Sequence, residues 1–335
     1  MRKLIATLMM GLPLAAAAQP STLDAVRARG EVLCAVHTGL PGFAVAGADG
    51  RMAGIDADTC RAVAAAALGD AGKVRFVPGS MADSLAATAA GRVDLVARAA
   101  TQTMMRDTAM GLAAAGVTVF DGQGFVVRRA SGIEDLAGLA GRTVCVTAGS
   151  TNEQSLADAA KRAGIAITPL ALPTLAELLA AFGEGRCAAL SADMVPLAGL
   201  VATRFGTAEH VMLPDVISRE PLGPFVRDGD RQWEQIAFWT VNALIEAEAM
   251  GITSANAATL RDSGPPRIRR LLGGLPGLGA PLGLPDDWMF RVVTQVGNYA
   301  EMYERNLGGG SPIGLVRGLN QLYDRGGLLY PVPMR

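Results

Sequence analysis

The chain has little of what most enzyme active sites are built from. Of its 335 residues only two are histidines, His37 and His210, and 5% are aromatic. Neither histidine stands in a pattern that would activate a thiolate, and two isolated histidines make no convincing zinc site. Gly-x-Ser-x-Gly, His-Glu-x-x-His and Walker phosphate-loop patterns are also missing. We therefore expect a protein that is not an enzyme and that uses neither a metal nor a cofactor.

An excess of charge of either sign is lacking as well. The 30 lysines and arginines are balanced by 31 aspartates and glutamates, which gives a net charge of −1. Binding to nucleic acid or to an anionic membrane surface depends on a strong positive excess. The composition therefore argues against both kinds of partner. Half of the residues are hydrophobic, so a chain of this length can build two domains with full cores.

Long apolar runs are absent beyond the first residues of the chain. Arg2 and Lys3 precede an apolar run at 4–14, which is too short to span a bilayer. Residues 15–18 then supply an Ala-x-Ala cleavage pattern. We predict a signal peptide over residues 1–18 and a soluble mature protein exported to the periplasm of a Gram-negative host. No cysteine stands at the cleavage point, which argues against a lipid anchor.

Cysteine is scarce, but its number is even. Cys34 and Cys60 lie in the first third of the chain, and Cys145 and Cys187 lie near its middle. In an exported protein an even set of cysteines indicates disulfides, and this spacing suggests one crosslink in each domain. Four free, buried thiols are the alternative.

Strands and helices alternate in two similar segments. The first segment predicts strands at 31–36, 74–78 and 93–97 and helices at 58–68 and 81–90; the second predicts strands at 143–147, 167–170 and 187–191 and helices at 150–162 and 175–182. This order is typical of a parallel sheet covered by helices. A similar phrase at 85–93 and 179–187 indicates two related α/β lobes.

Two Gly/Pro-containing stretches with β-forming residues, 121–128 and 218–226, suit extended crossings that can bend between the lobes. Ordinary surface loops are the alternative. The last third is helical, with helices predicted at 232–249 and 287–306. We expect lobe 1 to comprise 19–124 and 225–335, with the C-terminal helices, and lobe 2 to comprise 125–224.

Polar residues gather just after the predicted strands of both segments, where open α/β sheets bind ligands. They are the cation Arg106, the carboxylate Asp193, and the hydroxyls of Thr101, Thr103, Ser150 and Thr151. A guanidinium and helix N–H groups can hold an α-carboxylate, and a carboxylate can hold an α-ammonium. The set predicts a zwitterion site. The ordinary alternatives are a surface arginine and simple helix caps, and capping is also how we interpret Asp56 and Asp58.

Residues 23–335 resemble a known protein family in several longer sequence motifs. The matching phrases are residues 23–30, 38–43, 60–64, 120–125, 218–223, 253–256, 296–299 and 317–320. They resemble the general L-amino-acid-binding periplasmic proteins of ABC importers, in the polar amino-acid solute-binding group.

The resemblance implies an α/β fold like the type II periplasmic binding proteins. Two α/β lobes on a two-strand hinge, with a helical C-terminal extension, would close around one amino acid. The closed protein, expected to be a monomer, would deliver this ligand to an ABC permease in the inner membrane. All four cysteines match family positions, which implies the pairs Cys34–Cys60 and Cys145–Cys187.

By position, Arg106 resembles the family's α-carboxylate clamp and Asp193 its α-ammonium acceptor. Thr101 and Thr151 resemble supporting donors. The remaining ligand-binding residues that we expect are Thr103, Ser150, Gln102 and Leu40. Relatives usually read Arg-Asn-Thr-Thr-Trp-Thr-Leu where residues 98–104 here read Arg-Ala-Ala-Thr-Gln-Thr-Met. This difference predicts an altered side-chain pocket and a changed or narrowed substrate.

Two other classes of function stay open. An exported enzyme on the same scaffold, such as a cyclohexadienyl dehydratase, would need an acid or base in the cleft, for which Asp193 and His37 are the candidates. A sensor subunit would instead report its ligand state to a membrane receptor.

Overall fold

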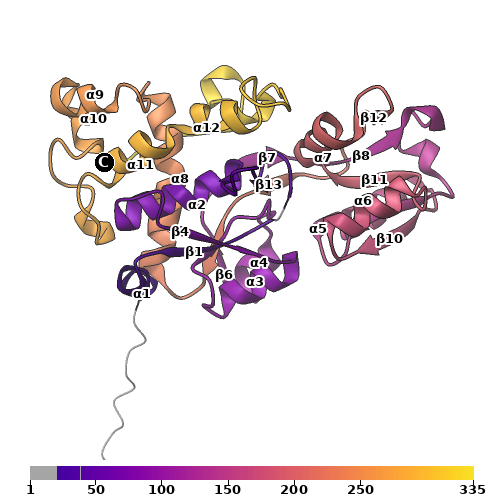
Figure 1. Ribbon diagram of the computed structural model, residues 1–335, viewed down its shortest axis with the longest axis horizontal. Helices are drawn as coiled ribbons and strands as arrows, with labels where there is room; N and C mark the ends of the chain where they lie inside the picture. Colours follow the sequence, from indigo (N-terminus) through magenta and orange to yellow (C-terminus); the bar gives the residue numbers. More distant parts are fainter. Residues whose placement is uncertain (1–20, 38) are drawn as a thin grey trace, which may run out of the picture.

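Two α/β lobes joined by a short two-stranded sheet make up the protein in our computed structural model, which describes residues 21–37 and 39–335 (Figure 1). The predicted signal peptide, 1–18, lies outside the described residues. None of the helices in the described part is long and apolar enough to cross a membrane.

The first lobe is built on a five-stranded sheet of order β4-β1-β5-β14-β6. Its strands are β1 (Val32–Val36), β4 (Val74–Pro78), β5 (Leu95–Val96), β6 (Leu112–Ala114) and β14 (Phe225–Arg227). β1 pairs in parallel with β4 and β5, as the sequence predicted. β14 is antiparallel to β5 and β6, so the sheet is mixed rather than fully parallel.

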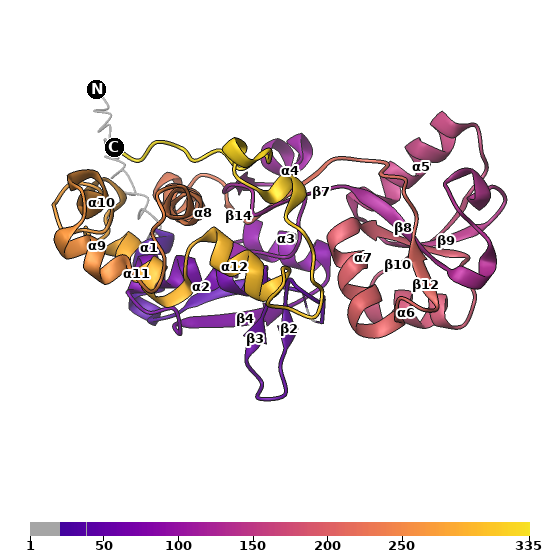
Figure 2. The ribbon, with the colours of Figure 1, turned by 90° about the horizontal axis from the view of Figure 1, so that it is seen from above.

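Alternation along β1 places helices on both faces of this sheet. Val32, Cys34 and Val36 belong to the large core cluster, whereas Ala35 belongs to a smaller cluster on the other face. The helices of this part are α1 (Thr22–Arg29), α2 (Ile55–Leu68), α3 (Met81–Ala89) and α4 (Met104–Ala109). A small hairpin of β2 (Val45–Ala46) and β3 (Met52–Ala53) projects from the lobe (Figure 2).

The second lobe repeats the design with the order β10-β9-β11-β8-β12. Its strands are β8 (Gln123–Arg128), β9 (Thr143–Thr147), β10 (Thr168–Leu172), β11 (Ala189–Asp193) and β12 (His210–Met212), and its helices are α5 (Thr151–Ala163), α6 (Leu175–Gly183) and α7 (Met194–Leu200). β9 is parallel to β10 and β11, and β8 is antiparallel to β11 and β12. In each sheet, the strand that follows a crossing from the other lobe is antiparallel to its neighbours: β8 in the second lobe and β14 in the first.

Two strands, rather than two surface loops, cross between the lobes. β7 (Val119–Asp121) and β13 (Glu220–Leu222) pair antiparallel, with Glu220 opposite Asp121. We call this pair of strands the hinge; Figure 1 shows it between the two sheets. The strands of the first sheet come from residues 32–114 and 225–227 and those of the second from 123–212. The lobe boundaries at 124/125 and 224/225 stay a prediction.

The C-terminal helices pack on the first lobe (Figures 1 and 2). They are α8 (Arg231–Ala249), α9 (Ala257–Ser263), α10 (Pro266–Leu271), α11 (Trp288–Val296) and α12 (Tyr299–Asn306). The single helix predicted at 287–306 was wrong. Gly297 leaves the helix at φ 93°, and Asn298 then caps α12 through a capping box with Glu301.

The last residues of the chain reach back to the hinge. The side-chain amide of Asn320 accepts the N–H of Phe120 in β7 at 2.7 Å and donates to its carbonyl at 3.0 Å. Arg317, three residues before, is held by Glu248 of α8 through two bonds of 2.7 and 2.9 Å. The extension therefore connects the first lobe to one hinge strand.

Helix α2 begins at Ile55, three residues before the predicted start. Asp58 consequently lies inside the helix and caps nothing. Its carboxylate instead accepts hydrogen bonds from Arg61 of α2 and from Arg305 and Asn306 of the C-terminal extension. The capping interpretation of Asp58 was wrong because its partners come from a distant part of the chain.

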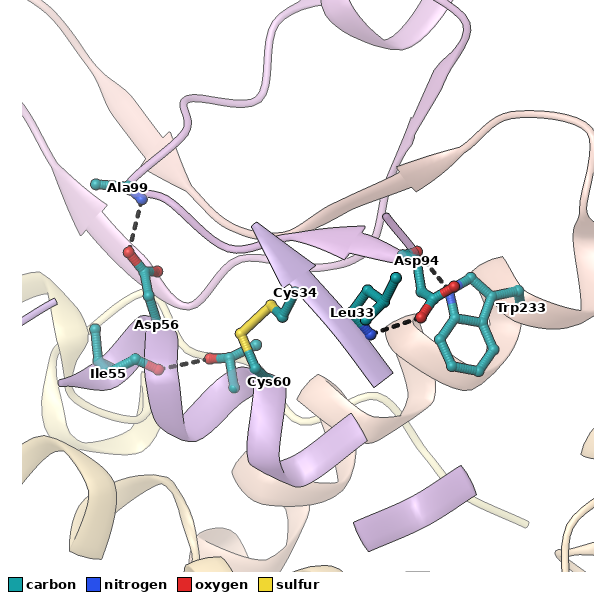
Figure 3. Close-up of a disulfide and its surroundings, with 9 residues drawn as sticks. Leu33, Cys34, Ile55, Asp56, Cys60, Asp94, Ala99 and Trp233 are labelled. Carbon is teal, nitrogen blue, oxygen red and sulfur yellow. Dashed lines mark hydrogen bonds between the residues drawn. A yellow bond between two sulfur atoms is a disulfide. The ribbon is translucent and has the colours of Figure 1, made fainter. Parts of the chain in front are cut away.

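Each lobe carries one disulfide, and neither disulfide crosses between the lobes. Cys34 of β1 joins Cys60 of α2, and Cys145 of β9 joins Cys187 just before β11. Figure 3 shows the first disulfide fastening α2 onto the sheet, with Asp56 on the same helix nearby. The structure therefore holds the two pairs that the resemblance implied, and no free cysteine is present in the described residues.

Replacing both Cys34 and Cys60 by alanine should lower the free energy of unfolding of the first lobe by about 3 to 4 kcal/mol, because the crosslink closes a loop with a sequence separation of 26. Urea denaturation of the oxidised proteins measures this change. The matched variant without Cys145 and Cys187 should destabilise the second lobe instead. A loss below about 1 kcal/mol would contradict the expected role.

Candidate functional site

The two lobes meet at a pair of threonines. Thr101 follows β5 of the first lobe and Thr151 begins α5 of the second, and their hydroxyl oxygens lie 3.2 Å apart. Both hydroxyls donate to the same carboxylate oxygen of Glu220 in the hinge, at 2.5 and 3.3 Å. The structure thus brings together two of the predicted residues and one that the sequence analysis did not single out.

Arg106 provides a buried cation on the side of the first lobe. Thr103 caps α4 by accepting the N–H of Arg106 at 3.2 Å, so this predicted residue positions the helix. The guanidinium donates to the carbonyl of Thr101 at 2.7 Å. Burial lowers the pKa of Arg106, while Glu220 and Asp193 act in the opposite direction. Within the described residues no carboxylate lies within 4.0 Å of this guanidinium.

Asp193 provides a buried carboxylate on the side of the second lobe. It ends β11 and precedes α7, but its side chain makes no capping bond, so the capping alternative was wrong. Instead it accepts a hydrogen bond of 2.7 Å from the amide of Asn152. Burial first, and then the charges of Asp121 and Glu220, raise the pKa of Asp193 well above its usual range. This carboxylate would gain strongly from a cation placed beside it.

A cavity of about 80 Å³ between the lobes is lined by Leu40, Ser150 and Asp193, three of the predicted residues. It is also lined by Arg98, whose Nε donates to the carbonyl of Gly79 at 3.0 Å. Burial lowers the pKa of Arg98 to about 10. Much of the remaining wall is apolar, and it comes mainly from the second lobe. This lining suits a small ligand with a charged end and an apolar part.

Helix α5 begins at Thr151, one residue after the predicted start, and Ser150 does not cap it through its side chain. The hydroxyl of Ser150 donates to the carbonyl of Thr147 at 2.6 Å instead of accepting from the helix. Glu153 accepts the N–H of Gly149, which lies outside the helix. Ser150 therefore lines the cavity without capping α5 through its side chain.

Gln102 is not brought to the cavity. Thr101 forms a β-bridge with Leu222, and side chains alternate along such an extended segment. With the Thr101 hydroxyl directed to the second lobe, the Gln102 amide lies on the opposite side and donates to the carbonyl of Gly116. Strand alternation thus places Gln102 away from the cavity that we expected it to line.

Asp56 is another residue whose interpretation as a cap was wrong. It is buried in the first turn of α2, and its carboxylate accepts the N–H of Ala99 at 2.8 Å (Figure 3). Burial raises the pKa of Asp56 to about 7. Ala99 has a φ of 46°, and it is the one non-glycine with a positive φ in the described part of the chain. Asp56 thus holds a strained turn between Arg98 and Thr101.

Glu220, Asn152, Arg98 and Asp121 are the residues that sequence reasoning missed. The signal for Glu220 was available, because it is a charged residue within a Gly/Pro-containing crossing of a chain with few charges. Asp121 carried the same signal in the other crossing, and Arg98 directly follows the predicted strand 93–97. Asn152 carried no such signal, since its importance depends on which residue lies opposite it. In the described residues no group of three or more His, Cys, Asp or Glu could hold a metal ion.

Comparison with known proteins finds a family and close relatives in sequence. Residues 32–258 match the bacterial extracellular solute-binding proteins, family 3. The general L-amino acid-binding periplasmic protein AapJ of Rhizobium johnstonii is 44% identical, over 96% of this chain and 95% of its own. The glutamate/glutamine/aspartate/asparagine-binding protein BztA of Rhodobacter capsulatus is 43% identical, over 96% and 95%.

A solved structure is similar over nearly the whole length. It is an ABC transporter periplasmic binding protein from Brucella ovis with glutathione bound, which is 41% identical. It superposes with a TM-score of 0.91, over 95% of this chain and 100% of that one.

The strained turn beside the site gives a prediction. Replacing Ala99 by glycine should raise the free energy of unfolding by roughly 0.5 to 1 kcal/mol, because the relief of left-handed strain exceeds the added freedom of the unfolded chain. Ala100 is fully buried and is not among the residues with positive φ, so Ala100→Gly should be destabilising. Urea denaturation measures the free energy of unfolding of both variants. An equal loss of stability in both would contradict the proposed backbone strain at Ala99.

Proposed function

Because the chain belongs to the bacterial extracellular solute-binding proteins of family 3, we propose that it captures an α-amino acid or a related zwitterion between its lobes and delivers it to an ABC-type permease. AapJ is named as a general L-amino acid-binding protein, and BztA is named as binding glutamate, glutamine, aspartate and asparagine. The similar solved structure holds glutathione. What these ligands share is an α-ammonium beside an α-carboxylate. The shared zwitterion is the part of the ligand that we carry over to this chain.

One observation carries the proposal. Arg106 of the first lobe and Asp193 of the second are both buried and act on each other electrostatically, yet they form no ion pair within 4.0 Å. Buried charges without a close partner are costly. A zwitterion placed between them would give each charge a partner of opposite sign.

In the proposed mechanism Arg106 holds the α-carboxylate through charge-assisted hydrogen bonds, and Asp193 holds the α-ammonium. Bending at the hinge brings the second lobe over a ligand docked on the first. Closure removes water, so the same ion pairs strengthen in a lower dielectric. A micromolar site would correspond to roughly −8 kcal/mol.

The proposal includes export and a membrane partner. Family 3 proteins are extracellular, and AapJ is named as periplasmic. We propose that the predicted signal peptide at 1–18 directs this chain to the periplasm, where an inner-membrane permease recognises the closed monomer. The relatives are named as binding proteins rather than enzymes, which supports capture without turnover.

A thermal-shift screen of the mature protein against the standard L-amino acids tests the proposal. Binding raises apparent stability by mass action, about 2.7 kcal/mol at a hundredfold excess over Kd. Arg106→Ala should weaken binding of every responding amino acid by about thirtyfold or more, because an α-carboxylate would lose its buried partner. Calorimetry on both proteins measures this loss.

Arg92 is an exposed arginine of the same lobe, so Arg92→Ala provides the matched control and should keep full affinity. Unchanged affinity in Arg106→Ala would refute the assigned clamp. A wild type that responds to none of the amino acids would refute the proposed function.

Binding should strengthen as pH rises. Burial raises the pKa of Asp193 and brings that of Asp121 to about 6, so the free protein keeps protons that exposed carboxyls would release. A bound ammonium favours the ionised carboxylates and lowers these pKa values, so binding releases protons. Arg106 and Glu220 face the same cluster and already act on Asp193.

Affinity for an L-amino acid should therefore increase by roughly tenfold between about pH 5 and pH 8, since one pKa unit corresponds to a tenfold change. Calorimetry in phosphate and Tris buffers measures both the affinity and the released protons. Equal affinity across this range would contradict the raised pKa values.

A further inference from the structure

Glu220 is a buried carboxylate on the strand that returns the chain to the first lobe (Figure 1). The residue is 2% exposed and lies opposite Asp121 of the other hinge strand. Carboxylates are seldom buried this deeply unless they are paired or hydrogen-bonded. Within the described residues no cation lies within 4.0 Å of Glu220, so its hydrogen bonds must compensate for its burial.

The hydrogen bonds of Glu220 come from hydroxyl groups on both sides of the cleft. One carboxylate oxygen accepts from Thr101 at 2.5 Å and from Thr151 at 3.3 Å. The other oxygen accepts from Ser218, two residues before it, at 2.5 Å. Thr101 belongs to the first lobe and Thr151 to the second, so a single hinge side chain contacts both lobes at the site.

These contacts decide the direction of the threonine hydroxyls. A hydroxyl has one proton to donate, whereas a carboxylate can only accept. The Thr101 proton is committed to Glu220, and the Thr151 proton is committed either to Glu220 or to the Thr101 oxygen 3.2 Å away. Neither hydroxyl has a proton left for a ligand, so both can only accept from it through their lone pairs.

Acceptors of this kind suit an ammonium group and not a carboxylate. An ammonium has three N–H donors and no acceptor. The two threonine oxygens and the carboxylate of Asp193 offer acceptors from both lobes, and Glu220 and Asp121 add negative charge around Asp193. The resemblance pointed to Thr101 and Thr151 as supporting donors, but the hydrogen bonds to Glu220 give their side chains the opposite role.

We propose that Glu220 is a positioning residue: it fixes the Thr101 and Thr151 hydroxyls as acceptors, and it makes the cleft select ligands that carry an α-ammonium over analogues that carry an α-hydroxyl. The inference rests on the proposed function and adds to it a residue and a selectivity. It also links recognition of the ammonium to the hinge, because Glu220 lies on β13.

Glu220→Gln tests this role with little change of shape. The glutamine amide replaces one of the two accepting oxygens by an N–H donor and removes the negative charge. The hydroxyls of Thr101, Thr151 and Ser218 can then no longer all donate to residue 220, and the threonine hydroxyls lose the arrangement that leaves their oxygens free for the ligand. The probes are the standard L-amino acid that binds the wild type tightest and the 2-hydroxy acid with the same side chain. Calorimetry gives Kd for both probes with each protein.

We expect Glu220→Gln to weaken binding of the amino acid by about thirtyfold or more, since a buried charge-assisted network is broken. Binding of the 2-hydroxy acid should change by less than about threefold, so the ratio of the two affinities falls. A purely structural role would weaken both probes equally, and that result would overturn the proposal.

Three further variants separate hydroxyl orientation from charge and from folding. Thr101→Val removes the hydroxyl and should reproduce the fall in the ratio, whereas Thr101→Ser should restore the preference for the amino acid. Asp121→Asn removes a neighbouring hinge charge that also acts on Asp193, but it touches neither threonine hydroxyl, so it should lower the ratio clearly less than Glu220→Gln does. If Glu220→Gln does not fold, the two Thr101 variants still decide the matter.

The outcomes distinguish this inference from the proposed function. A wild type that binds amino acids, with an unchanged ratio in Glu220→Gln and Thr101→Val, overturns the role of Glu220 alone. If Asp121→Asn lowers the ratio as much as Glu220→Gln does, the selectivity is due to charge alone, and the role of Glu220 in orienting the hydroxyls is also overturned. A wild type that binds no amino acid removes the proposed function together with the inference.

Discussion

The burial of charge where the two lobes meet is the constraint on which the structure depends. Arg106, Asp193 and Glu220 are each at most 6% exposed, and their charges act on one another across the cleft. A buried charge without a close partner costs several kcal/mol. The protein tolerates this cost where two lobes, each with its own disulfide, meet. A zwitterion supplies the opposite charges that the chain itself does not bring into contact.

The surrounding scaffold keeps this arrangement local. Each disulfide ties a strand to its own lobe, and the lobes are covalently connected only through the hinge. Asn320 adds a further tie, since it bonds to both backbone polar groups of Phe120 in β7. The C-terminal extension therefore acts on the hinge as well as covering the first lobe. Rigid lobes on a narrow connection are the arrangement that hinge closure requires.

The segment at 98–104 shows how a sequence difference can change a site without changing its charged residues. Gln102 stands where the resemblance led us to expect an aromatic residue, yet its side chain lies away from the cavity. Ala99 lines the cavity and takes a left-handed conformation that asparagine tolerates better than alanine. The altered pocket expected from this segment therefore involves Ala99 more directly than Gln102, and Arg98 beside it lines the same cavity.

The sequence by itself determined that there are two α/β lobes, and it located their parallel strands. Hydrophobic periodicity is a local property of the sequence. It was therefore sufficient to predict β9 at its observed bounds and α5 to within one residue at each end. The charge opposition of Arg106 and Asp193 also followed from their positions after equivalent strands. Tertiary structure alone decided the antiparallel β14, the partners of Asp56 and Asp58, and the contact of Glu220 with both threonines. These features depend on pairing between residues far apart in the chain, and hydrogen-bond partners at such separations leave no periodic trace in the sequence.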